Sequence, residues 1–132
     1  MPRAILDESS IHPAIRERVA SHHSDIVREV QDAVASNDVV VVGMRFNPFP
    51  KRARAALARA GVAHRYLEYG GYLSDWRRRN ALKMWTGWPT FPMVFVRGTL
   101  IGGAQELEAL LASGELQKML AAPGPGAPIN AV

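Results

Sequence analysis

A run of four valines at residues 39–42 limits the fold more strongly than any other segment of the chain. Asn37 and Asp38 precede the run and Gly43 follows it, so the run is short and is bounded by turn residues. β-Branched residues favour strands, and a strand without a polar face must be covered on both sides. The valine run therefore predicts a buried strand.

Helical and strand patterns alternate on either side of this strand. Apolar residues at helical spacing between residues 13 and 34 predict one bent helix or two short ones, the second beginning near Ser24. The sequence NPFP at residues 47–50 predicts a turn, because proline fixes φ and removes a donor. Further helices are expected over residues 51–60, 74–84 (with Ser74 as cap) and 104–120, the last interrupted at 113–114. Further strands are expected over residues 64–68, 93–96 and 99–101, the last two forming a hairpin.

This order predicts an α/β fold with a mixed four-stranded sheet and helices on both faces. Residues 1–24 are interpreted as a partly helical N-terminal extension and residues 25–120 as the domain. Residues 121–132 form a Pro/Gly sequence that is expected to be disordered.

Composition excludes several classes of protein. The chain has 132 residues, of which 48% are hydrophobic, as suits one domain with a real core. No apolar run approaches the roughly 20 residues of a membrane helix, and the first residues lack the apolar core of a signal peptide. We therefore expect a cytoplasmic protein without a membrane partner.

The net charge of +4 is mild and no nucleic-acid motif accompanies it, so nucleic acid is the least favoured partner. The histidines show no metal-ligand spacing.

The stretch GWPTFPMVFVRGTLIGGAQEL at residues 87–107 carries the most specific pattern in the chain. A W-P-T-x-P motif at residues 88–92 is followed by the expected hairpin and then by Gly102-Gly103. Arg79 and Lys83 precede it at an R-x-x-x-K spacing. In this order the motifs resemble the glutaredoxin family of the thioredoxin-fold superfamily, and its monothiol group most closely, over residues 25–120.

One departure from the glutaredoxin pattern removes the family's chemistry. Glutaredoxins place C-P-Y-C or C-G-F-S after the first strand, whereas this chain has Asn47-Pro48-Phe49-Pro50 there and no cysteine anywhere. Asn47 and Pro50 thus occupy the cysteine positions. Disulfide exchange needs a thiolate, and the iron–sulfur cluster of monothiol glutaredoxins uses the same cysteine. We therefore assign no catalytic residue and expect no iron–sulfur cluster, although kinship would link the chain to cell redox homeostasis.

The resemblance still implies a groove for glutathione. It implies a cis peptide bond between Phe91 and Pro92, so that the backbone of Phe91 could pair with an extended ligand. It also implies that a ligand carboxylate would approach the helix start at Gly102-Gly103. Gln105 stands where the family often has an aspartate for the amino end of the ligand, so a charge is lost there.

The basic residues before the motif have two interpretations. Arg79 and Lys83 could neutralise the glycine carboxylate of glutathione with help from Arg45, or they could belong to a solvated basic surface. Trp88 is expected to line the site or to support its loop, and Trp76 and Trp85 are expected to pack. The expected glutathione-binding residues are Arg45, Phe49, Arg79, Lys83, Thr90, Phe91, Pro92, Gly102, Gly103 and Gln105, with Asn47 at the mouth of the groove.

These features predict a protein that binds glutathione, or an extended segment of a partner protein, without catalysing a reaction. The alternative is a protein-interaction module that uses the N-terminal and basic helices and does not bind glutathione. A weak nucleic-acid binder is the third hypothesis, and a homodimer is left open.

Overall fold

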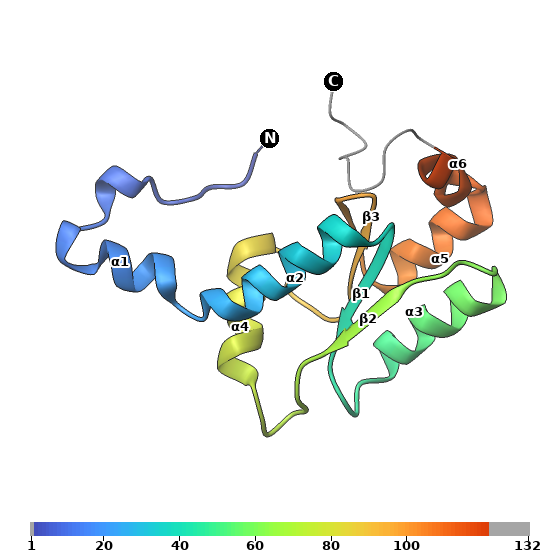
Figure 1. The fold of residues 1–132 in the computed structure, drawn as a ribbon, viewed down its shortest axis with the longest axis horizontal. Coiled ribbons are helices and arrows are strands. Elements are labelled where there is room, and N and C mark those ends of the chain that lie inside the picture. The colour runs from blue at the N-terminus through green and yellow to red at the C-terminus, as the bar shows by residue number, and fades with distance from the viewer. Residues whose placement is uncertain (1, 122–132) are drawn as a thin grey trace.

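A computed structural model describes residues 2–121 and contains a mixed four-stranded sheet with the strand order β2-β1-β3-β4 (Figure 1). β1 pairs with β2 in parallel and with β3 antiparallel, and β3 pairs antiparallel with β4. The strands are β1 (Val39–Gly43), β2 (Arg65–Glu68), β3 (Met93–Val96) and β4 (Thr99–Gly102). The predicted α/β fold with a mixed four-stranded sheet is confirmed.

Helices cover both faces of this sheet. α2 and α4 pack on one face, and α3, α5 and α6 pack on the other. The helical elements are a 3-10 turn (Glu8–Ser10), α1 (Pro13–Ser21), α2 (Ser24–Ser36), α3 (Pro48–Arg59), α4 (Trp76–Thr86), α5 (Ala104–Ser113) and α6 (Glu115–Ala121). None of the helices within residues 2–121 is long and apolar enough to cross a membrane. The expected disordered tail lies outside the described residues, apart from Ala121.

The valine run forms β1 and is buried on both sides. Val39 and Val41 belong to the cluster under α3, α5 and α6, whereas Val40 and Val42 belong to the cluster under α2 and α4. Each of the four valines is at most 1% exposed. Alternate side chains of a strand point to opposite faces, so this apolar run serves two cores at once, as predicted.

The start of α3 differs from the prediction. NPFP was expected to be a turn, but Asn47 is the N-cap and Pro48 is the first residue of the helix. Proline is well tolerated there, because its missing N–H would have had no partner within the helix. The Pro50 ring packs over Gly43, where a Cβ atom would come within 2.6 Å of it. This packing fixes α3 against the end of β1.

The predicted capping of α4 by Ser74 is wrong. Asp75 precedes the helix with a φ of 60° and makes no side-chain cap hydrogen bond. The Ser74 hydroxyl instead accepts the N–H of Gly71 at 3.0 Å. Ser74 therefore shapes the loop before α4.

The hairpin and the break in the last helix are confirmed. Arg97 and Gly98 join β3 to β4 with φ angles of 52° and 83°, as a tight hairpin turn between twisted strands requires. Gly114 ends α5 with a φ of 79°, and α6 follows. The N-terminal helical segment is two helices, separated at His23 with a φ of 46°.

Candidate functional site

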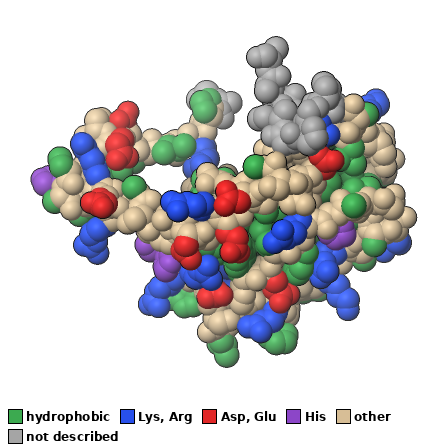
Figure 2. Space-filling view, in the orientation of Figure 1, with side chains coloured by type: hydrophobic (Ala, Val, Ile, Leu, Met, Phe, Trp, Pro, Cys, Tyr) green, Lys and Arg blue, Asp and Glu red, His purple; other side chains and the backbone are tan. Residues whose placement is uncertain are grey.

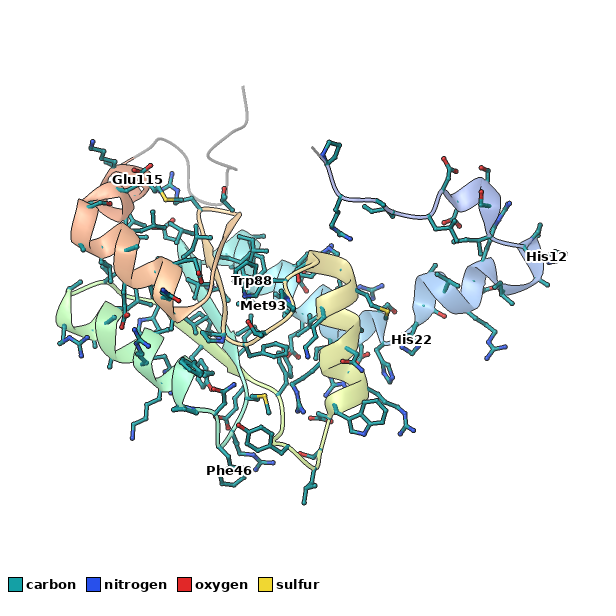
Figure 3. The ribbon with its side chains drawn as sticks, turned by 180° about the vertical axis from the view of Figure 1, so that it is seen from behind. His12, His22, Phe46, Trp88, Met93 and Glu115 are labelled. Atoms are coloured by element: carbon teal, nitrogen blue, oxygen red, sulfur yellow. The ribbon has the colours of Figure 1, made fainter. Side chains whose placement is uncertain are left out.

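A groove of about 300 Å³ lies where three segments of the chain meet. These segments are the start of α3, the loop before β3 and the start of α5. Figure 3 shows Trp88 near the middle of the molecule, close to Met93 at the start of β3. The residues that line the groove are Phe49, Trp88, Thr90, Phe91, Pro92, Gly103, Ala104, Gln105 and Glu106.

The Phe91–Pro92 peptide bond is cis, as predicted. Asn47 lies beside it and uses both ends of its carboxamide. Its Oδ1 accepts the N–H of Phe49 at 2.9 Å, which caps α3, and its Nδ2 donates to the carbonyl oxygen of Phe91 at 3.4 Å. Asn47 therefore joins the helix start to the loop that forms the groove wall. Neither this amide nor Pro50, which has no N–H, can act as a nucleophile or ionise as a thiol does.

Glu106 is a groove residue that the sequence interpretation missed. Its Oε1 accepts the N–H of Gly103 at 2.8 Å, which is the reciprocal half of a capping box at the start of α5. The G-x-x-E spacing in the sequence was the available signal. The groove thus contains a carboxylate one residue after Gln105, the position at which the resemblance implied a lost charge.

Trp88 contributes an unused donor next to this capping box. Its Nε1 is buried and has no hydrogen-bond partner among the described residues. A Cβ atom at Gly103 would lie 3.7 Å from Nε1, so the indole faces the glycine. A buried donor without a partner costs roughly 1–3 kcal/mol, and a ligand acceptor at this place would remove that cost.

The structure separates the predicted basic residues from the groove. Arg79 is 6% exposed, and its Nη1 donates to the carbonyl oxygens of Tyr69 at 2.9 Å and Ser74 at 2.6 Å. Burial lowers the pKa of Arg79 from its ordinary value, although Asp75 opposes this shift. Arg79 thus supports the loop before α4 and is not among the residues that line this groove.

Of the other predicted glutathione-binding residues, some line the groove and some do not. The structure brings Phe49, Thr90, Phe91, Pro92, Gly103 and Gln105 together around the groove. Lys83 is not a lining residue, but its Nζ lies 5.7 Å from the centroid of the Phe91 ring, which belongs to the groove. Arg45 lines a different cavity, and Gly102 lies against the side chain of Glu106.

The tryptophans fit the expectations in part. Trp85 packs against Phe95 with ring centroids 6.0 Å apart. Trp76 does not pack into the core, since it is 49% exposed and carries the Arg77 guanidinium over its ring.

The described residues contain no group of three or more His, Asp or Glu side chains that could hold a metal ion. The full sequence contains no cysteine that could ligate an iron–sulfur cluster. The groove presents backbone groups, the indole N–H of Trp88, the polar side chains of Thr90 and Gln105 and the carboxylate of Glu106, none of which can exchange thiols.

A sheet of this strand order, with a cis-proline loop beside the start of the helix that follows β1, defines a thioredoxin-like fold. The glutaredoxin family model matches residues 39–101. A glutaredoxin-like protein of Dictyostelium discoideum is 46% identical over 98 residues, covering 74% of this chain and 80% of the relative. A probable monothiol glutaredoxin 2 of Rickettsia conorii is 35% identical, covering 70% and 89%. The chain belongs to the glutaredoxin family.

Solved structures agree with this assignment. Oxidized glutaredoxin 2 from Chlamydomonas reinhardtii superposes with a TM-score of 0.63 at 31% identity, covering 74% of this chain and 92% of that one. A buckwheat glutaredoxin–glutathione complex gives a TM-score of 0.65 at 25% identity, covering 76% and 91%. This member of the family thus keeps the fold without a cysteine.

Proposed function

We propose that this glutaredoxin-family protein binds glutathione, or an extended peptide segment, without reacting with it. The observation that carries the proposal is the position of Asn47. Its carboxamide stands where the family has its nucleophile and is hydrogen-bonded to the carbonyl oxygen of Phe91 in the groove wall. The site therefore keeps its shape while its reactive group is replaced by an unreactive one.

The groove offers groups that suit the backbone and the amino end of such a ligand. The backbone of Phe91 can pair with an extended peptide as an added strand does. Its carbonyl oxygen has two lone pairs, so Asn47 leaves one of them for the ligand. The carboxylate of Glu106 is suited to pair with the ligand's amino group, which compensates for the uncharged Gln105.

The same carboxylate makes the groove less favourable for a ligand carboxylate. Glu106 already uses the N–H of Gly103, a donor that a carboxylate would otherwise approach at the start of α5. Its negative charge also repels an anion at this end of the groove. The proposal therefore includes a preference for an amino group at this end. The buckwheat glutaredoxin–glutathione complex supports glutathione as the ligand through its likeness in fold.

A titration with reduced glutathione, followed by backbone amide shifts, tests this proposal. We expect saturable shifts at Phe91, Gly103 and Gln105. S-methylglutathione should bind within about twofold of glutathione, because no step involves the thiol. Glu106→Gln should weaken binding about fivefold through the lost charge on the amino-end contact. Glu115→Gln on α6 removes the same charge away from the groove and is the matched control.

The absence of saturable shifts at millimolar glutathione would reject glutathione binding and favour the interaction module. A specific observation supports that second candidate. Phe46, in the loop between β1 and α3, is 81% exposed, and Leu73, in the loop between β2 and α4, is fully exposed. The second loop comes close to Phe46, because a Cβ atom at Gly71 would lie 3.1 Å from the Phe46 ring. Figure 3 shows Phe46 pointing away from the body. Large exposed apolar side chains on neighbouring loops are typical of protein contact sites.

A further inference from the structure

A second cavity, of about 530 Å³, lies between α3 and β2 and shares no lining residue with the groove. We call it the α3–β2 cavity. Part of its wall is apolar, with Met44, Phe46, Pro48 and Pro50. The rest is strongly basic, with Arg45, Lys51 and Arg54.

The three basic residues of the α3–β2 cavity have no ion-pair partner among the residues that the structure describes. The ion pairs found within residues 2–121 involve Arg52, Arg78 and Arg97 instead. One carboxylate, that of Glu68, lies in the wall of the cavity, so three cations and one anion leave a charge of +2. In Figure 2 blue Lys and Arg side chains are visible on the face that carries α3 and β2. Like charges that converge on one hollow repel each other unless an anion enters it.

Tyr66 holds two of these groups in place. Its hydroxyl donates to Glu68 Oε1 at 3.1 Å, and the Arg54 guanidinium lies 4.0 Å from the centroid of its ring. Burial and the hydrogen bond to Glu68 raise the pKa of Tyr66 to about 12, so the phenol stays neutral and keeps donating at physiological pH. The carboxylate of Glu68 thus has one hydrogen-bond donor within the protein, and the contact with the Tyr66 ring holds the guanidinium of Arg54 in place.

We propose that the α3–β2 cavity binds a small organic phosphate. A phosphoryl group presents three acceptor oxygens and up to two negative charges, which matches two guanidinium groups and one ammonium group better than a carboxylate does. The organic part of the ligand packs on the apolar wall formed by Met44, Pro48 and Pro50. Asn47, at the mouth of the glutathione groove, also lines this cavity, so the two sites adjoin there; the thiol chemistry of the family takes no part in this binding.

A titration with phenyl phosphate at low ionic strength tests the proposal, with inorganic phosphate and phenylacetate as comparison ligands. We expect saturable amide shifts confined to residues 44–54 and 66–68, with phenyl phosphate binding more tightly than either comparison ligand. Arg54→Gln should weaken binding about tenfold. Arg59→Gln makes the same change on the same helix outside the cavity and should change binding less than about twofold. Lys51→Gln provides a second test, because Lys51 is exposed and its loss does not disturb the packing on Tyr66.

Four results would each overturn the proposal. Shifts spread over all basic surfaces, or equal losses in Arg54→Gln and Arg59→Gln, would show a response to net charge alone. Inorganic phosphate binding as tightly as phenyl phosphate would remove the role of the apolar wall. Phenylacetate binding as tightly would remove the role of the phosphoryl group.

Discussion

At the scale of single residues, Asn47 decides what the site can do. A cysteine at a helix start is activated because the N-terminal amides and the helix dipole stabilise its thiolate. Asparagine at the same place is a neutral cap for those amides, because its Oδ1 accepts the N–H of Phe49. The site thus exchanges a reactive group for a structural one, and the bond to Phe91 keeps the groove wall attached to α3.

Asn47→Ala should lower the free energy of unfolding by about 1 kcal/mol, because the N–H of Phe49 loses its cap. Urea denaturation with linear extrapolation measures this change. Asn47→Asp is the matched control, since it keeps an acceptor for Phe49 but cannot donate to Phe91. We expect the Asp variant to unfold near the parent while its glutathione titration changes. An alanine variant as stable as the parent would show that the cap contributes nothing.

At the scale of elements, the three consecutive arginines of α4, residues 77–79, make three different kinds of contact. Arg77 lies over the Trp76 ring, whereas Arg78 pairs with Asp25 of α2 at 3.0 Å. Arg79 points inward to the carbonyl oxygens of the loop that joins β2 to α4. The sequence left open whether these residues form a ligand site or a solvated surface. For Arg79 the answer is neither, because its partners are backbone groups of its own chain.

Arg79→Met should lower the free energy of unfolding by about 2 kcal/mol, because two carbonyl oxygens lose a charged donor. Arg77→Met on the same helix should change it by less than about 0.5 kcal/mol, since Arg77 is exposed. Thermal and urea unfolding of both variants give the comparison. If Arg79→Met unfolds like the parent but loses glutathione binding, the guanidinium serves a ligand and the structural role assigned here is wrong.

Short sequence patterns predicted the elements whose conformation is decided by neighbouring residues in the chain. The valine run, the hairpin turn at Arg97-Gly98 and the break at Gly114 follow from side-chain branching and from positive φ angles. The resemblance to glutaredoxins added the cis bond at Phe91–Pro92. Neither source could show that Asn47 bonds a carbonyl 44 residues away, or that Arg79 turns inward, because these contacts arise only when separate elements pack.

At the scale of the whole molecule, most of residues 2–21 stand apart from the three-layered body of helices, sheet and helices. Figure 1 shows α1 extending away from the sheet and its covering helices. α1 buries none of its residues, and Ile15 and Val19 are 44% and 51% exposed. Arg3 returns to the body and donates to the carbonyl oxygen of Trp85 at 3.2 Å. The helical pattern in the sequence therefore predicted α1 correctly as a helix, but its apolar stripe does not reach the core.

Removal of residues 1–21 should change the free energy of unfolding by less than about 1 kcal/mol, because exposed side chains contribute little to stability. Removal through residue 30 is the informative control, because it deletes Ile26 and Val30, two fully buried residues of α2. That longer deletion should abolish cooperative unfolding, as expected when large core side chains are lost. Circular dichroism during urea denaturation distinguishes the two outcomes. A loss of more than about 2 kcal/mol from the shorter deletion would mean that α1 belongs to the folded unit, and glutathione binding would then have to be tested on the full chain alone.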